Sequence, residues 1–279
     1  MNNFTNLFYL LIIVFLSSCA SIEIVNVSQD EITNVSKDVE SVSQDELFEK
    51  FLDKQWELDL ADSPVFASMI GNKKYNKLIS SNSIEQFNIN KEKSNIALAK
   101  LQSFDIDMLS EDNKLNYRLA ELGMQNDINR MKYPTYFMQL NQRGGVQSYY
   151  ETGDRLIYTS RQDYEDWLIR LESYAVNIAN SLTNNKKALE LGYSQPKIVT
   201  NGVISQIKTI LDSKIENNPY MQVFLNANEN YFEDGQKSDL IRRAKIVIEG
   251  TILPSYKNLY DFLKNEINFK YFKGNILNE

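Results

Sequence analysis

The chain has 279 residues and carries 37 Asp or Glu side chains against 30 Lys or Arg, for a net charge of −7. That length is ample for a hydrophobic core, and the acidic balance argues against a nucleic-acid partner, which would need a basic face. Histidine is absent and cysteine occurs once. The sequence therefore excludes Ser-His-Asp and Cys-His catalytic groups and an internal disulfide. Because imidazole and thiolate are the usual ligands of zinc and transition metals, we also expect no such metal site and no cofactor in this chain.

The N-terminus resembles a lipoprotein signal peptide. Leu7 to Leu16 is an apolar run of ten residues, too short to span a bilayer comfortably. It leads into Leu16-Ser17-Ser18-Cys19, which resembles the lipobox of bacterial lipoproteins. We therefore predict a signal peptide over residues 1–18, cleavage before Cys19 and acylation of its thiol. A short membrane anchor or a buried helix, either with an incidental cysteine, is the alternative interpretation.

The predicted anchor implies a place in the cell. Several acyl chains on one residue give stable membrane attachment, so the membrane is an expected partner. Ala20 follows Cys19 where an aspartate would resemble an inner-membrane retention signal. The predicted location is the cell envelope, at the outer membrane and facing the periplasm.

Residues 19–42 are predicted to form an acidic tether. Polar residues dominate this segment, and the motif Asn-Val-Ser recurs at Asn26 and Asn34. Nothing in it predicts a face for a core, so it is read as a linker between the lipid and a helical domain over residues 43–279. A partner-binding motif is the alternative.

Helical periodicity begins at Ser43. Ser43 and Glu46 have the spacing of a capping box, and Ser63-Pro64 is a typical helix start that Gly71 could end. Two apolar faces are predicted here, Phe48, Phe51, Leu52 and Trp56 in the first helix and Phe66, Ala67 and Ile70 in the second.

Two further helices are predicted before residue 133. Ser83 would cap one that runs to about Leu101, and Ser110 would cap the next. Leu115, Leu119, Leu122 and Ile128 share one side of the latter, which predicts a buried face.

Residues 133–158 are predicted to be an ordered loop because Tyr133-Pro134 and Gly144-Gly145 interrupt a helix. Ser160 and Asp163 then open the clearest helix of the chain. Its predicted core face consists of Tyr164, Trp167, Leu168, Leu171, Tyr174, Ala175, Ile178 and Leu182.

Breaks define the remaining helices. Gly192 is a predicted stop and Pro196 a restart, Asn218-Pro219 is another break, and a last helix spans residues 238–262 with a kink at Pro254. No stretch alternates with period two. The predicted fold class is mainly α, an irregular multi-helix bundle.

Candidate chemistry is sparse. Glu151, Asp154, Asp163, Glu165 and Asp166 cluster in sequence, but helix capping and a solvated face explain them better than a paired-carboxylate hydrolase. The stretch Gln142 to Gly145 predicts a tight turn or, alternatively, a loop that lines a cleft. Arg170 could pair with a buried carboxylate or extend to the surface.

A set of motifs in a fixed order resembles the N-terminal half of the lipoprotein family known as domain of unknown function 885. The likeness runs from about residue 47 to residue 265. The motifs are Ser63-Pro64, Ala67 and Gly71; Leu109-Ser110-Glu111-Asp112 and Leu115-Asn116-Tyr117; Asn141-Gln142 and Gly144-Gly145; Tyr164, Leu168 and Arg170-Leu171; Gly192, Pro196 and Val199; Asn218-Pro219-Tyr220; and Leu253-Pro254, Tyr256, Leu259 and Phe262-Leu263.

This resemblance implies a fold and a function. Such proteins look like helical zinc peptidases whose metal ligands and catalytic glutamate lie in a C-terminal half. None of those residues maps onto this chain. The resemblance implies that Asn141, Gln142, Gly144 and Gly145 line the cleft wall, and that the chain is a truncated or split non-catalytic N-terminal half with a separate C-terminal half as a partner. The alternative is a stand-alone lipid-anchored binding or scaffold protein without enzymatic activity.

Overall fold

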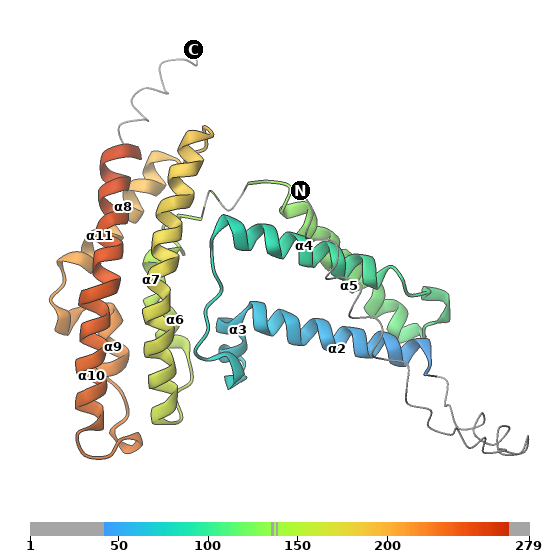
Figure 1. Ribbon diagram of the computed structural model, residues 1–279, viewed down its shortest axis with the longest axis horizontal. Coiled ribbons are helices and arrows are strands. Elements are labelled where there is room, and N and C mark those ends of the chain that lie inside the picture. The colour runs from blue at the N-terminus through green and yellow to red at the C-terminus, as the bar shows by residue number, and fades with distance from the viewer. Residues whose placement is uncertain (1–41, 135–136, 138, 268–279) are drawn as a thin grey trace, which may run out of the picture. The chain divides into compact units, whose positions relative to one another are not determined.

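A computed structural model describes residues 42–134, 137 and 139–267. Within these ranges every regular element is helical and there is no strand, which confirms the mainly α class and the irregular bundle (Figure 1). Contacts divide the chain after Ser43, and all the described helices belong to the second unit. Residues 1–18, Cys19 and nearly all of the tether lie outside the described residues, so their assignments stay predictions. No helix of the described part has the length and apolarity needed to cross a bilayer.

The first helices begin where the capping residues predict. Helix α2 spans Gln44–Asp62, α3 Pro64–Met69, α4 Ile84–Leu101 and α5 Glu111–Arg130, with short 3-10 turns η1 (Lys73–Tyr75) and η2 (Ile106–Met108). The Ser83 side chain accepts a hydrogen bond from the backbone N–H of Gln86 at 3.1 Å, so it caps α4 as predicted. Gly71 has a φ of 88°, the left-handed conformation that ends α3.

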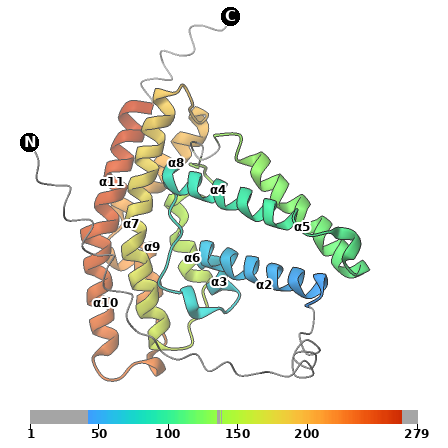
Figure 2. The ribbon, with the colours of Figure 1, turned by 45° about the vertical axis from the view of Figure 1, so that its right-hand side comes forward.

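The remaining elements are the 3-10 turns η4 (Val146–Ser148), η5 (Ile215–Asn217) and η6 (Glu229–Tyr231), the α-helices α6 (Tyr150–Arg155), α7 (Arg161–Glu190), α8 (Lys197–Asp212), α9 (Pro219–Leu225), α10 (Gln236–Val247) and α11 (Leu253–Phe262), and the π-helices η7 (Ile248–Ile252) and η8 (Leu263–Ile267). Helices α7, α10 and α11 lie side by side (Figures 1 and 2). Most helix ends agree with the predicted breaks.

The predicted loop over residues 133–158 is partly wrong, because it contains η4 and the short helix α6. A tertiary contact fixes α6. A Cβ added to Gly153 would lie 2.8 Å from the Trp167 ring and 2.9 Å from the Val223 side chain. Only glycine therefore allows α6 to approach α7 and α9 so closely, and a six-residue helix shows no periodicity of its own.

The predicted last helix is also modified around its proline. It begins at Gln236, and a π-helical turn, η7, precedes Leu253-Pro254. Proline has no backbone N–H to donate to the carbonyl four residues earlier. The widened π turn accommodates that missing bond within a continuous helical path.

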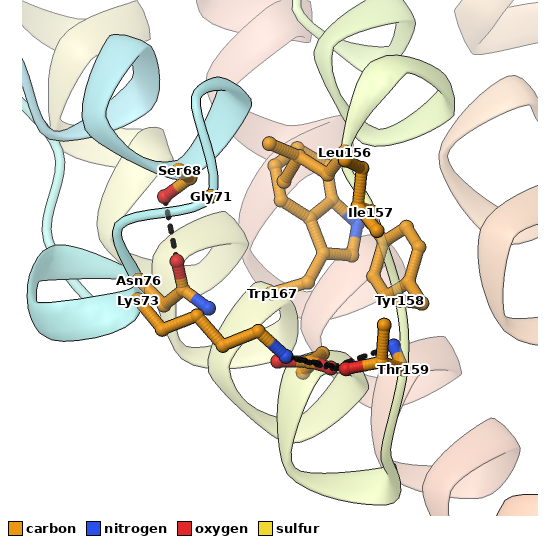
Figure 3. Close-up of a pocket in the computed structure, with 10 residues that line it drawn as sticks. Ser68, Gly71, Lys73, Asn76, Leu156, Ile157, Tyr158, Thr159 and Trp167 are labelled. Carbon is orange, nitrogen blue, oxygen red and sulfur yellow. Dashed lines mark hydrogen bonds and ion pairs between the residues drawn. The ribbon is translucent and has the colours of Figure 1, made fainter.

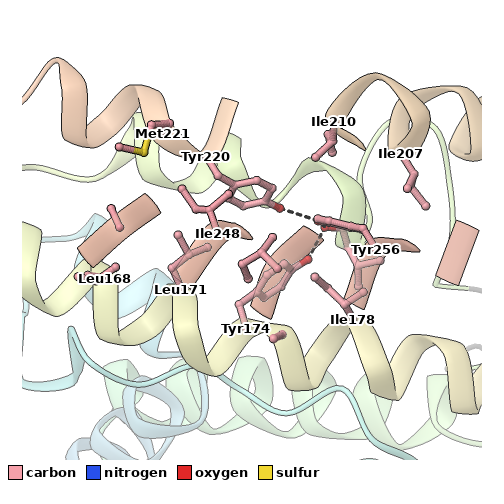
Figure 4. Close-up of a cluster of buried hydrophobic side chains, with 14 of the residues drawn as sticks. Leu168, Leu171, Tyr174, Ile178, Ile207, Ile210, Tyr220, Met221, Ile248 and Tyr256 are labelled. Carbon is pink, nitrogen blue, oxygen red and sulfur yellow. Dashed lines mark hydrogen bonds between the residues drawn. The ribbon is translucent and has the colours of Figure 1, made fainter. Parts of the chain in front are cut away.

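The main core lies between α7 and the helices that follow it (Figure 4). Every predicted core residue of α7 from Tyr164 to Ile178 is buried, and Leu182 is partly buried. Inside the core, the hydroxyls of Tyr174 and Tyr256 both donate to the Val146 carbonyl, and the Tyr220 hydroxyl contacts that of Tyr256 at 2.5 Å. Burial raises the pKa of all three tyrosines, so they stay neutral. Tyr174 and Tyr256 fix η4 by their hydrogen bonds to Val146.

A smaller core cluster joins α2, α4 and α5, and here the predicted faces are partly wrong. Phe48, Phe51 and Tyr117 are buried together with Leu101 and Leu109. Several side chains that were expected inside are instead about half exposed, namely Trp56, Phe66, Ile70, Leu115, Leu119 and Leu122. The helical periodicity of apolar residues locates a stripe on a helix, but it does not show which neighbouring element covers that stripe.

Arg170 is fully buried, so neither expectation for it holds. Its Nη2 donates to Ser68 Oγ at 2.7 Å, to the Tyr75 carbonyl at 2.9 Å and to the Pro64 carbonyl at 3.3 Å, and none of these partners is a carboxylate. Its Nε and Nη1 have no hydrogen-bond partner among the described residues. One arginine on α7 thus holds both α3 and η1.

Amide side chains of α7 continue this attachment along the segment that leads to α4. Asn177 Nδ2 donates to the Ser80 carbonyl at 2.9 Å, Asn184 Nδ2 donates to the Asn82 carbonyl at 2.8 Å, and Asn82 Nδ2 donates to Ser181 Oγ at 2.9 Å. These bonds replace water for a stretch of backbone that belongs to no helix. Helix α7 therefore buries an apolar face on one side and a polar face on the other.

The N-terminus of α7 carries the predicted capping box. Asp163 Oδ2 accepts from the backbone N–H groups of Thr159 at 2.8 Å and Ser160 at 2.9 Å, and from Lys73 Nζ at 2.7 Å. Burial by itself would raise the pKa of Asp163, but the hydrogen bonds from Lys73, Thr159 and Ser160 outweigh burial and lower it. The carboxylate is therefore ionised at neutral pH.

We expect Arg170→Ala to lower the free energy of unfolding by about 3 kcal/mol, because it leaves a cavity and removes three hydrogen bonds from a charged donor. Arg130→Ala is the matched control, since the Arg130 side chain is 78% exposed. Urea denaturation followed by circular dichroism measures both. A loss below about 1 kcal/mol in Arg170→Ala would contradict the role of Arg170 as the attachment point of α3 and η1.

We expect Asp163→Asn to lower stability by about 1 kcal/mol at pH 7, because the variant keeps an acceptor but loses the charge of the cap. A carboxyl group whose pKa is lower in the folded chain than in the unfolded chain stabilises the fold at pH values above its unfolded-state pKa. The difference between the two proteins should therefore shrink once the pH falls below the ordinary value of 3.8 and disappear as it passes the lowered pKa. Urea titrations at pH values from 7 to about 3 measure it, and a pH-independent difference would contradict this account.

Candidate functional site

A small cavity lies where α3 and η1 meet the start of α7, and it is the first candidate site. Its volume is about 230 Å³. Leu156, Ile157, Tyr158 and Trp167 form an apolar wall, and Lys73, hydrogen-bonded to Thr159 and Asp163, lies at its edge (Figure 3). The cavity is large enough for a few waters or a very small molecule.

The chemistry that this cavity can support is limited. The Lys73–Asp163 pair neutralises itself, and Asp163 is ionised and saturated with donors, so it is poorly suited to act as a general acid. The Trp167 Nε1 atom lies in the wall, is closed to solvent and has no hydrogen-bond partner among the described residues. Polar groups of this kind can orient a bound molecule, but they do not form a nucleophile–base pair.

Four of the five clustered carboxylates lie beside separate cations, and the fifth, Asp154, is exposed on α6. Asp163 pairs with Lys73, Glu165 with Arg243 at 2.8 Å, and Glu151 with Arg155 at 2.8 Å, while Asp166 is 3.8 Å from Lys77. The Arg243 hydrogen bond, together with the charges of Arg243 and Arg161, lowers the pKa of Glu165 despite its partial burial. These pairings support helix capping and surface ion pairs as the role of the cluster.

The predicted cleft-lining loop packs on α8. The Gln142 carbonyl accepts from Gln206 Nε2 at 2.9 Å, and the Asn141 carbonyl accepts from Gln147 Nε2 at 2.7 Å. The Gln142 side chain lies over Gly202, where an added Cβ would come within 2.8 Å of it. Asn141 and Gln142 are exposed, and Gly144 and Gly145 are half-buried. These four residues line none of the three cavities described in this chain, and their place in a cleft wall stays a prediction.

A second and larger opening is a groove of about 730 Å³ between α2, α4 and the second half of α5. Its floor contains Phe51, Phe104 and Met124, and lysines and aspartates form its rim. A shallower hollow of about 480 Å³ lies beside Pro254 on α11. In the ranges that the structure covers, no three Asp, Glu, His or Cys side chains come close enough together to hold a metal ion.

Sequence reasoning missed Lys73, Trp167 and Arg170 as parts of one region. Lys73 and Asp163 are 90 residues apart, and no local pattern joins them. Arg170 stood out only as a charge among apolar positions. That signal is a real one, because a charged residue on a buried stripe needs partners from elsewhere in the fold.

Comparisons with known proteins assign a family. No curated protein matches the chain. A structure described as that of a putative lipoprotein from Colwellia psychrerythraea is similar, with a TM-score of 0.68 at 14% identity. The match covers 80% of this chain and 41% of that one, so this chain spans about two-fifths of the longer protein. The family model for DUF885, bacterial protein of unknown function, matches residues 64–271. Because that model matches most of the chain, the protein belongs to the DUF885 family.

Proposed function

We propose that this chain is a lipid-anchored protein of the bacterial envelope that supplies the non-catalytic N-terminal part of a larger, zinc-peptidase-like DUF885 fold. The observation that carries the proposal is the coverage of the structural match, which leaves more than half of the longer protein without a counterpart here. The family match spans residues 64–271, which include α7. Attachment through Cys19 rests on the lipobox and agrees with the description of the similar structure as a lipoprotein.

The surface of the described helices supports a scaffold role. Leu115, Leu119 and Leu122 of α5 are each more than half exposed and follow one another at helical spacing. Large apolar patches on soluble proteins mark contact surfaces. A stripe of three exposed leucines is suited to pack against another part of a larger helical fold.

The side chains of this chain support a non-catalytic role, with the metal site in another part of the fold. Peptidase zinc sites draw mainly on imidazole and thiolate ligands, and this sequence has no histidine and one cysteine that the lipid would consume. The carboxylates of Asp163 and Glu165 on α7 are already paired with Lys73 and Arg243. A remaining part of the fold would therefore supply the metal ligands and the catalytic glutamate, and this chain would supply a wall of the cleft, including the loop from Asn141 to Gly145.

A stand-alone binding or scaffold protein is the second candidate. The groove of about 730 Å³ favours it, because a groove of that size is in the range of ligand sites. This candidate needs no further polypeptide to be functional.

We expect the chain alone to bind zinc weakly and to cleave no peptide. Isothermal titration with zinc and a fluorogenic peptide assay measure this. Adding a polypeptide for the unmatched part of the DUF885 fold should produce chelator-sensitive cleavage. Tight stoichiometric zinc with cleavage by the chain alone would show the proposal to be wrong. Failure of the two polypeptides to associate would favour the stand-alone scaffold.

We expect Cys19→Ser to abolish acylation and leave the precursor uncut, since no second thiol exists to accept a lipid. Radiolabelled palmitate incorporation in a bacterial host measures the modification, and the mobility of the band reports cleavage. Ser18→Ala is the matched control, because it keeps a small residue before the cysteine and should be processed normally. Label that persists in Cys19→Ser would refute the anchor.

A further inference from the structure

The groove between α2, α4 and α5 has the length of several helical turns. Helices α2 and α4 run antiparallel beside it, because Phe51 packs on Phe104 at one end and Asp62 pairs with Lys93 at the other. The lining of α2 extends from Leu47 to Asp62. At 1.5 Å per residue this stripe is about 22 Å long, or about four helical turns.

The groove leaves large apolar side chains without cover. Leu47 is 45% exposed, Leu58 46% and Ile96 62%. Met124 and Met131 lie at its α5 side, and methionine side chains adapt easily to a partner's shape. Covering such a row would remove apolar surface from water, so the groove favours a ligand with an apolar face of matching length.

The two ends of the groove carry opposite charge. At the Phe104 end, Lys100 Nζ lies 5.4 Å from the ring centroid of Phe104 and makes no ion pair with any described residue, while Lys54 lies near the middle of the α2 stripe. At the other end, Asp59 lies near Asp62 and Asp127, and burial and these two carboxylates raise its pKa. Lys93 and Arg130 pair with Asp62 and Asp127, and no cation of the described residues pairs with Asp59.

We propose that this groove binds an amphipathic α-helix of another polypeptide, with the helix N-terminus at the aspartate end and its C-terminus at the Lys100 end. A helix has an apolar stripe at spacings of three and four residues, and its dipole is positive at the N-terminus and negative at the C-terminus. Both features match the groove. A fatty acyl chain would fit worse, because its apolar end would have to lie among Asp59, Asp62 and Asp127.

The volume of the groove determines how deeply a bound helix can insert. A volume of about 730 Å³ accommodates a row of side chains but not a whole helix. The bound helix would therefore lie along the opening and insert apolar side chains between α2 and α4. This inference does not depend on a peptidase-like function, since the groove is separate from α7 and from the loop of Asn141.

The test uses the full chain and two fluorescein-labelled synthetic helices of about four turns, both with leucines on one stripe. One carries Lys in its first turn and Glu in its last turn, and the second has these charges exchanged. Fluorescence anisotropy should show that the first binds about tenfold more tightly, which corresponds to about 1.4 kcal/mol. The Lys100→Glu variant should lose most of this preference, and Leu58→Asp should weaken both peptides.

Matched controls keep the result specific. Lys91 lies on the same helix as Lys100 but outside the groove, so Lys91→Glu changes net charge equally. That variant should retain the tenfold preference, and melting curves should show that all variants fold. Equal affinity for the two peptides, an equal effect of the control variant, or displacement of the peptide by oleate with no dependence on peptide charge order would overturn the proposal.

Discussion

The buried guanidinium of Arg170 is the contact on which the arrangement around α7 depends. Its Nη2 reaches Pro64, Ser68 and Tyr75, three residues of α3 and η1 that are about a hundred positions away in sequence. Burying a charge raises the free energy of the fold unless the charge is hydrogen-bonded. Moving α3 and η1 away from α7 would therefore leave the Arg170 guanidinium without its hydrogen-bond partners. The same helix face continues in Asn177, Ser181 and Asn184, which bind the backbone of the segment before α4.

The opposite face of α7 forms the main core together with the C-terminal helices. Its aromatic and aliphatic side chains meet those of α8 to α11, and the hydroxyls of Tyr174 and Tyr256 meet at one carbonyl, that of Val146. Tyrosine is suited to this place because its ring belongs to the core and its hydroxyl satisfies a buried polar group. The turn η4, and with it the loop from Asn141 to Gly145, is thus positioned by the core.

The N-terminal helices differ from this pattern because they are less completely covered. Phe48, Phe51 and Tyr117 close one end of the space between α2, α4 and α5, and the groove remains along the rest of α2. The exposed leucines lie on α5, and the half-exposed apolar side chains of the groove lie on α2 and α4, so both surfaces belong to this group of helices. A scaffold that meets other polypeptides would have such surfaces, whereas the well-packed helices around α7 provide the rigidity that holds them.

The sequence alone determined the helical class, the capped helix starts at Ser83, Ser110 and Ser160, and the breaks at Gly71 and Gly192, because each depends on atoms within about four residues. The core face of α7 could also be predicted, since one long stripe leaves little choice. Of the candidate site, Asp163 was foreseen as a cap, but its pairing with Lys73 was not. Only the tertiary structure decided that Tyr117 and not Leu115 is buried on α5, that Arg170 is fully enclosed, and that a groove opens beside α2. These outcomes depend on neighbours far away in sequence, which periodicity and capping patterns do not encode.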